Sequence, residues 1–359
     1  MQGKDIKLLT HEDGFKMVSQ NGNLALPPNN EILYDDLGNP SVMVKIPKFT
    51  YEDLGLPGSG THPAFIVDGK EIPYIYISKY QNIVENGRAY SLPYQRPHHT
   101  VTFDQAKEFC EAKGKGWHLM SNAEWAAIAL WCKKNECMPY GNNNYNYGDY
   151  YKTSEKGAPM PGRMYYNPDN PDEGWDDIPY TATGSGPKSW FHNNDFSGIA
   201  DLNGNVYEWV SGVRCEKGEL QVIENNNSAM GVDESATSTL WKAISQAGKY
   251  VAPGTSGAIK FGSSGISTDG MFKEATAASG VTIPALVKAL ALFPNDAADT
   301  YRDDYYWVNS TSADRLFYRG GYCSDEDSAG VFFYNGSHAR SLAHDGLGFR
   351  SAFVELPTE

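Results

Sequence analysis

The sequence is poor in cysteine and has no long apolar run. Its five cysteines are scattered over 359 residues without a Cys-x-x-Cys pair, which argues against a disulfide framework. We expect buried free thiols, although Cys132 and Cys137 are close enough in sequence to form a bridge. No run of 18 apolar residues occurs, and the first residues contain no apolar signal segment. From these absences we expect that the sequence contains no membrane span and no signal peptide.

Positive charge is also scarce. The chain has 30 Lys and Arg against 44 Asp and Glu, a formal net charge of -14. Nucleic acids and anionic membranes bind basic surfaces, so we expect no nucleic-acid partner and no membrane insertion. With 40% hydrophobic residues, 36 glycines and 20 prolines, the composition predicts a sizeable core joined by many turns.

The order of local patterns predicts one large domain. Residues 1–40 are polar and read as an N-terminal arm, whereas 41–359 form the domain, with an insertion at about 215–300. Two capping-box patterns, at Thr102–Gln105 and Ser121–Glu124, predict two helix starts. Residues 138–200 read as loops, and a further buried helix is expected after Pro284. Four tryptophans are expected in the core, namely Trp125, Trp131, Trp209 and Trp307.

The closing stretch, residues 317–353, has a distinct pattern. It begins with FYRGGY and ends with GFRSAF, and the residues between have no helical or strand period. A constant-looking frame around irregular residues is typical of a recognition surface held on a rigid scaffold. Arg319 and Arg350 are expected to pair inside the protein, and the neighbouring glycines to permit tight turns.

Three phrases in one order carry a family resemblance. LMSNAEWAAIAL, DLNGNVYEWV and RGGY…GFRSAF resemble the phrases of the formylglycine-generating-enzyme branch of the C-type-lectin fold. The resemblance implies an α+β, C-type-lectin-like domain of the formylglycine-generating-enzyme (sulfatase-modifying factor) subtype, with two helices and an inserted subdomain. It spans about residues 41–214 and 301–356.

This chain lacks the residues on which the enzymes of that family depend for catalysis. The oxidase branch has a cysteine pair shortly after RGG that binds copper, whereas Cys323 is the single thiol in that part of this chain. The iron branch has a three-histidine site, whereas His98, His99, His192, His338 and His344 form no His-x-x-x-His pattern. The calcium-dependent sugar motifs of lectins are also missing. We therefore expect no enzymatic activity, with a sulfatase-modifying-type oxidase as the alternative.

The closing stretch more closely resembles the variable region of proteins diversified by retroelements. AGVF at 329–332, ARS at 339–341 and GFR at 348–350 follow the pattern of that family. Two departures adjoin RGG: Cys323 stands where Trp is common and Glu326 where Gly is common. The resemblance implies a ligand-binding protein, such as a phage tail receptor binder.

Residue usage agrees with that resemblance. Randomised template adenines yield most residue types, but not Lys, Met, Trp, Gln or Glu, which number 65 of the 359 residues. At that frequency a 37-residue stretch would hold about seven, and residues 317–353 hold one, Glu326. The positions expected to vary and contact ligand are Tyr322, Cys323, Ser324, Asp325, Asp327, Ser328, Phe333, Ser337, His338, Leu342, Ala343, His344, Asp345 and Gly346. Tyr322 is expected to be exposed, and Tyr334 to belong to the scaffold.

Two expectations concern metals. The block from Asn203 to Glu208 resembles a structural calcium loop of the fold, in which Asn205, Glu208 and the carbonyls of Gly204 and Val206 would be ligands. The alternative is a turn before a strand in which Glu208 accepts hydrogen bonds from backbone amides. His338 and His344 are expected to be contact residues rather than metal ligands, and no other cofactor is expected.

Together these observations favour host-receptor recognition. The ligand would be a host surface protein or glycan, and the protein would act on a phage virion (tail) or a cell surface after synthesis in a bacterial cytoplasm. A homo-oligomer or multivalent display on a virion would raise weak affinity through avidity. A structural tail or surface protein without diversification is the other alternative.

Overall fold

The computed structural model describes residues 26–145, 147–160, 180–296 and 299–356. One of its main sheets has five antiparallel strands in the order β1-β2-β5-β18-β8. These strands are β1 (Asn30–Tyr34), β2 (Pro40–Pro47), β5 (Tyr74–Ser78), β8 (Trp117–Leu119) and β18 (Ser351–Phe353). Strands from both ends of the described chain thus share one sheet.

The other main sheet has nine strands. Its order is β12-β11-β10-β9-β15-β16-β14-β13, and β17 pairs in parallel with β9. The strands are β9 (Tyr207–Glu216), β10 (Glu219–Ile223), β11 (Trp241–Ile244), β12 (Tyr250–Val251), β13 (Asp269–Met271), β14 (Tyr305–Val308), β15 (Arg315–Gly320), β16 (Gly330–Ala339) and β17 (Leu347–Phe349). Two hairpins complete the strands: β3 (Ile66–Val67) with β4 (Lys70–Glu71), and β6 (Ile83–Glu85) with β7 (Arg88–Tyr90).

The helices begin where the capping patterns predict. In α1 (Phe103–Glu111) and α2 (Asn122–Lys134), the N-cap hydroxyl and the side chain three residues later exchange hydrogen bonds with each other's backbone amides. This arrangement satisfies two amides that a helix start leaves free. A third helix, α3 (Ala285–Ala289), follows Pro284 as expected. None of the helices in the described residues is long and apolar enough to span a bilayer.

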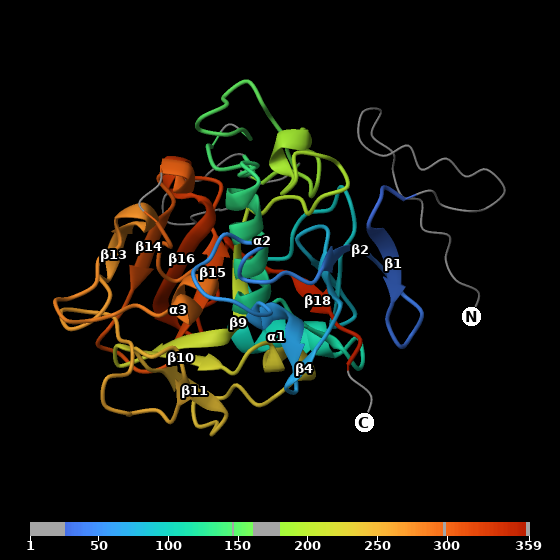
Figure 1. The fold of residues 1–359 in the computed structure, drawn as a ribbon. Coiled ribbons are helices and arrows are strands. Elements are labelled where there is room, and N and C mark those ends of the chain that lie inside the picture. Colours follow the sequence, from blue (N-terminus) through green and yellow to red (C-terminus); the bar gives the residue numbers. More distant parts are fainter. Residues whose placement is uncertain (1–25, 146, 161–179, 297–298, 357–359) are drawn as a thin grey trace, which may run out of the picture.

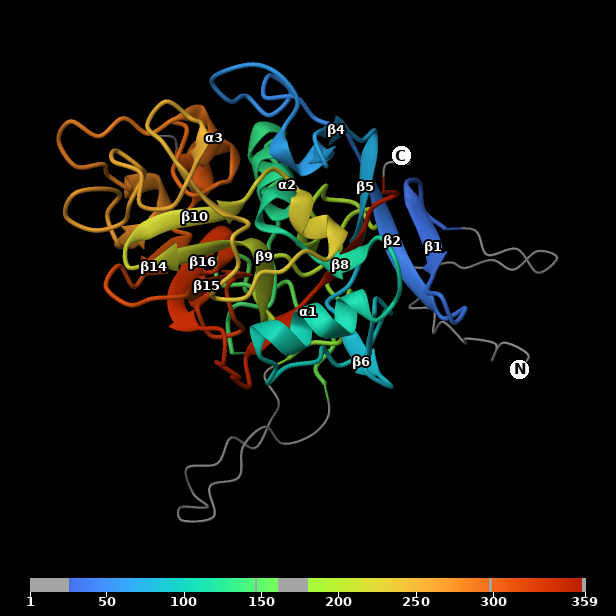
Figure 2. The same ribbon diagram turned by 90° about the horizontal axis from the view of Figure 1, so that it is seen from below.

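Helix α2 lies at the centre of the molecule. Figure 1 shows it between the strands β13 to β16 on one side and β1, β2 and β18 on the other. Ten of its residues are buried, including Trp125, whose indole donates to the Val331 carbonyl on β16 at 2.8 Å. Figure 2 shows α1 in the lower part of the view, between β6 and β8 and in front of the rest of the chain. The predicted α+β fold with two principal helices is confirmed.

Two segments are more closely joined to this fold than the sequence indicates. Strand β1 lies within the predicted arm 1–40 and pairs with β2 along its length, so the described end of the arm forms a sheet edge. Strands β10 to β13 of the predicted insertion, 215–300, extend the nine-stranded sheet. Leu220 and Ile244 from this insertion share one hydrophobic cluster with Val44. The insertion therefore packs into the common core.

One buried ion pair connects the two main sheets. Arg350 follows β17, and its guanidinium donates to both carboxylate oxygens of Glu208 on β9, at 2.8 and 2.9 Å. It also donates to the carbonyls of Ser78, at the end of β5, and Lys79 and Ala200. Both charged side chains are 0–1% exposed. The predicted internal pairing of Arg350 is confirmed.

Replacing Arg350 by methionine should strongly destabilise the fold. The change leaves the Glu208 carboxylate buried without its countercharge, which costs about 3 to 5 kcal/mol of unfolding free energy. Urea denaturation followed by circular dichroism measures this difference. Lys48→Met is the control, because the Lys48–Glu71 pair is exposed and water replaces its partner. Equal effects of the two substitutions would contradict the assigned role of Arg350.

Candidate ligand-binding surface

The closing stretch 317–353 supplies most of β15 and all of β16, β17 and β18, of which β15 and β16 pair with each other and β18 lies in the five-stranded sheet. RGG ends β15, AGVF begins β16, and GFR spans β17 and the turn into β18. Gly320 and Gly321 have φ angles of +91° and +80°, a region that non-glycine residues rarely adopt. A Cβ atom on Gly321 would lie 2.4 Å from that of Ala329. The glycines thus allow the loop from 321 to 329 to fold tightly onto the start of β16.

Arg319 holds this frame from inside. Its guanidinium donates to Asn122 Oδ1 at 2.6 and 3.0 Å and to the carbonyls of Leu290 and Ala291. It lies 5.1 Å from the ring centre of Tyr334, and both side chains are 0% exposed. The expected internal pairing of Arg319 and the scaffold position of Tyr334 are confirmed. Arg319 therefore fixes β15 against α2 and the residues after α3.

A groove of about 380 Å³ lies over β14, β16 and the loop before β17. We call it the β14–β16 groove. Six of the positions predicted to contact ligand line it: Asp325, Ser328, Phe333, His338, Leu342 and His344. Tyr207, Tyr305, Trp307, Tyr318, Asn335 and Leu347 complete the lining. The fold thus brings predicted contact residues from three segments of the closing stretch together.

The aromatic wall of this groove was not expected from the sequence. Trp307, predicted to lie in the core, is 57% exposed, so that prediction is wrong. Along β14 the residues alternate, with Tyr306 and Val308 buried on the inner face and Tyr305 and Trp307 on the outer face. YYWV has no alternation of apolar and polar residues. A strand prediction alone would place Tyr305 and Trp307 on one face, but nothing in this sequence indicates that their face is the outer one.

Tyr207 organises the floor of the groove. Its ring centre lies 4.9 Å from that of Tyr318 and 5.5 Å from those of Tyr322 and Phe333. The planes of Tyr322 and Phe333 are each inclined by 24° to it. Offset aromatic pairs of this kind stabilise one another beyond the area that they bury. The floor is therefore a rigid aromatic surface rather than a set of separate side chains.

Asp325 places a carboxylate beside this floor. Its Oδ1 accepts from the Tyr207 hydroxyl at 2.9 Å, and its Oδ2 accepts from the Tyr322 amide at 3.0 Å. Burial raises the pKa of Asp325 to about 6, against the smaller opposing effects of these two hydrogen bonds. Among the described residues that line the groove, none is a lysine or an arginine. The charged form of Asp325 is thus held by dipoles and not by a cation.

Phe333 lines the groove but is only 6% exposed, and three further predicted contact residues are also less accessible than expected. Cys323 is 0% exposed and packs with Tyr180 and Val206, so its prediction as a contact residue is wrong. Gly346 is also buried, and a Cβ there would meet the Tyr322 ring at 2.5 Å. Tyr322 itself is half-buried, because its ring stacks on Tyr207. These three residues support the loops from within.

The remaining predicted contact positions lie around the groove. They are half-buried or exposed, and they occupy the loop 321–329, the end of β16 and the loop after it. They are Ser324, Asp327, Ser337, Ala343 and Asp345. Such a rim of short side chains resembles the polar margin of a protein recognition surface.

The comparisons identify the family. The model of the FGE-sulfatase family, the sulfatase-modifying factor enzyme 1-like domain, matches residues 61–279, more than half of the chain. The chain belongs to the FGE-sulfatase family. No curated protein matches the sequence. PvdO from Pseudomonas aeruginosa is similar in structure, with 16% identity, 92% of this chain and 99% of that chain covered, and a TM-score of 0.35. Treponema denticola variable protein 1 has 14% identity, coverage of 91% and 99%, and a TM-score of 0.35.

The cysteines of this FGE-sulfatase chain do not provide a reactive pair on the surface. All five are free and buried. Burial raises the pKa of the Cys323 thiol to about 12, which keeps it protonated and a poor nucleophile or metal ligand. Cys323 also packs in a different cluster from Cys132, Cys137 and Cys215.

His338 and His344, two of the predicted contact residues, have hydrogen-bond partners close to them in the chain or on β15. His338 Nδ1 lies 3.1 Å from the hydroxyls of Tyr318 and Ser337, and His344 Nδ1 accepts from the Gly346 amide at 2.9 Å. Within the described part of the chain, no three His, Cys, Asp or Glu side chains are grouped to hold a metal ion. Both histidines face the groove, where contact with a ligand remains their predicted role.

The predicted calcium ligands converge on a side-chain amide. Gln81 Nε2 lies 3.0 Å from Glu208 Oε1, 3.1 Å from the Val206 carbonyl and 3.4 Å from the Gly204 carbonyl. The fourth ligand, Asn205, turns its oxygen toward the Thr181 amide at 2.9 Å. In this arrangement the oxygens of Gly204, Val206 and Glu208 surround the Gln81 amide. A cation at this place would have to displace that amide.

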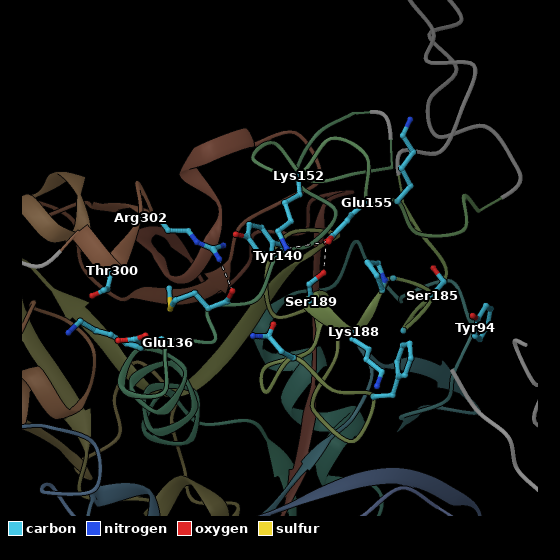
Figure 3. A pocket seen from close by; sticks show the side chains of 18 residues that line it. Tyr94, Glu136, Tyr140, Lys152, Glu155, Ser185, Lys188, Ser189, Thr300 and Arg302 are labelled. Atoms are coloured by element: carbon cyan, nitrogen blue, oxygen red, sulfur yellow. Dashed lines mark hydrogen bonds and ion pairs between the residues drawn. The ribbon is translucent and has the colours of Figure 1, made fainter. Parts of the chain in front are cut away.

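A larger hollow of about 1270 Å³ lies on another part of the surface (Figure 3). Lysines line it, but the structure pairs three of them with acids at 2.8 to 3.3 Å: Lys133 with Asp296, Lys152 with Glu155 and Lys188 with Asp195. Arg302 donates to the Met138 and Pro139 carbonyls. Because these cations already have partners, their number does not indicate an anionic ligand.

Asp325→Asn should remove a pH-dependent loss of stability. A carboxyl whose pKa rises on folding binds its proton more tightly in the folded state, so stability falls as pH rises from about 4 to above 6. The variant should therefore gain about 2 kcal/mol relative to the native chain between pH 4 and pH 8. Denaturant unfolding at both pH values measures the gain. Glu326→Gln controls for the lost charge, and an equal gain in that variant would contradict the assignment.

The calcium prediction can be tested by thermal unfolding. We expect the same Tm in excess EDTA and in millimolar calcium, because Gln81 Nε2 already satisfies the carboxylate and carbonyl oxygens. Gln81→Ala removes this donor, and the oxygens then have room for a cation. A calcium-dependent rise in Tm of the native chain would mean that the ion displaces the amide.

Proposed function

We propose that this chain is a ligand-binding protein whose segment 317–353 is diversified by a retroelement. A host surface protein or glycan is the ligand, and the setting is a phage virion (tail) or a cell surface. The supporting observation is the division of that segment into a buried frame and an accessible face. The groove gathers six positions whose residues fall in the alphabet available to adenine randomisation.

The frame supports this function because it tolerates change on its outer face. Arg319 and Arg350 are fully buried and are held by hydrogen bonds to distant segments. Their contacts involve no side chain of the predicted variable positions. Substitutions at Ser328 or His338 therefore leave the contacts of both arginines in place, as antibody loops vary on a constant sandwich.

Recognition without catalysis is the second part of the proposal. The oxidase alternative needs two thiols after RGG, and this chain has only the buried Cys323 there. The groove contains aromatic rings, hydroxyls and one half-buried carboxylate, that of Asp325. Rigid aromatic side chains provide contact area with little loss of conformational entropy, which suits binding.

Attachment and multivalency follow from the size of the groove. A hollow of about 380 Å³ accommodates a side chain or a small group, so single-site affinity is modest. Several copies on one particle would multiply it through avidity. We propose that residues 1–40 or 215–300 mediate this assembly. Tyr34 and Leu37, which are 61% and 68% exposed on the turn after β1, provide apolar surface for it.

Sequencing the coding region in many isolates tests diversification. We expect substitutions to concentrate between residues 322 and 346, at codon positions where a nearby template copy has adenine. Positions 319 and 350 and the core residues of α2 are the internal control, and they should stay constant. Scattered substitutions, or changes at template positions other than adenine, would contradict the proposal.

A further inference from the structure

We propose that the β14–β16 groove of this chain binds a cationic side chain, arginine or lysine, of a protein partner. The inference rests on the proposed function, because it takes the groove as the recognition surface. To the proposed function it adds the chemical class of the group that enters the groove. The argument rests on the aromatic walls, on the half-buried carboxylate of Asp325, and on a described lining that contains no lysine or arginine.

The walls present aromatic faces to an entering group. Tyr305 and Trp307 stand two residues apart on the outer face of β14, and Trp307 is opposite Asn335 of β16 in the strand register. Trp307 is 57% exposed, although an indole of this size is usually covered in a folded protein. A guanidinium or ammonium group over such rings is attracted by their negative faces, and indole is the strongest of them.

The carboxylate supplies the complementary charge. Asp325 accepts two hydrogen bonds, from Tyr207 and from the Tyr322 amide, and its lining neighbours offer no ammonium or guanidinium group. A second acid, Asp269, lies 3.4 Å from the Tyr305 hydroxyl at the edge of the groove. A half-buried carboxylate without a countercharge, such as Asp325, gains from a cation that displaces water as it enters.

Two arginines near the groove, Arg315 and Arg340, do not occupy it. Among the described residues, Arg315 is near enough to influence His338, but it does not line the groove. Arg340 is engaged by Asp314 at 2.7 Å and by Asp104 at 2.8 Å. With a net charge of -14 on the chain, long-range attraction also favours a basic partner.

The cation preference is specific to this variant. Tyr207, Tyr305 and Trp307 lie outside residues 317–353, so they are present whatever the variable positions hold. Asp325 lies inside that segment and is one of the predicted variable positions. The aromatic walls thus give every variant an apolar contact, whereas the residue at 325 selects the charge of the group that enters.

The test uses the full chain and two short peptides. Acetyl-Gly-Arg-Gly-amide should quench the exposed indole of Trp307, whereas the citrulline analogue, which keeps the shape but not the charge, should bind at least about tenfold more weakly. Trp307→Phe should remove the fluorescence change. Asp325→Asn, checked for folding by its unfolding curve, should weaken arginine binding about tenfold. Leu240→Ala, an exposed apolar side chain outside the groove, is the control and should bind as the native chain does.

The outcomes separate the inference from the proposed function. Equal binding of the arginine and citrulline peptides, or undiminished arginine binding by Asp325→Asn, would overturn the cationic ligand. Quenching by methyl glycosides instead of the arginine peptide would overturn it in favour of a glycan. Neither result would change the pattern of substitutions among isolates, which tests the proposed diversification. Conversely, scattered substitutions would overturn diversification even if the arginine peptide binds.

Discussion

The ion pair between Arg350 and Glu208 holds together the parts on which the binding surface stands. Arg350 lies at the junction of β17 and β18, where the chain passes from the nine-stranded sheet to the five-stranded one. Glu208 belongs to β9, and the Ser78 carbonyl to the end of β5. Because all these groups are removed from water, the pair has few alternative partners. The relative position of the two sheets depends on this contact.

From that contact outward, the binding segment is built as a rigid frame with a changeable face. Arg319 fixes the start of the segment to Asn122 at the beginning of α2, and Arg350 fixes its end. Both arginines point inward, away from the β14–β16 groove. The contacts of these two arginines do not involve the predicted variable side chains, whereas Asp325 and His344 each accept a hydrogen bond from an amide of their own loop.

The groove combines two kinds of residue with different constraints. Tyr207 stacks with Tyr318 and Phe333 and gives the floor its shape. Asp325, His338 and His344 add polar groups that hydrogen-bond locally, to hydroxyls and backbone amides. Membership of the FGE-sulfatase family fixes the scaffold, but the residues in the groove decide what can bind. Here they offer aromatic faces and a carboxylate.

Local patterns in the sequence determined the helix starts and the frame. The capping boxes at Thr102 and Ser121 involve residues three apart, so their hydrogen bonds can be read directly. The phrases around Arg319 and Arg350 likewise indicated the family and two internal arginines. Only the tertiary structure placed Trp307 outside, buried Cys323 and set the Gln81 amide among the oxygens around Glu208. These outcomes depend on contacts between distant segments; Gln81 and Glu208, for example, are 127 residues apart in the chain. Such contacts are decided by packing and by competition among distant partners, which no local pattern records.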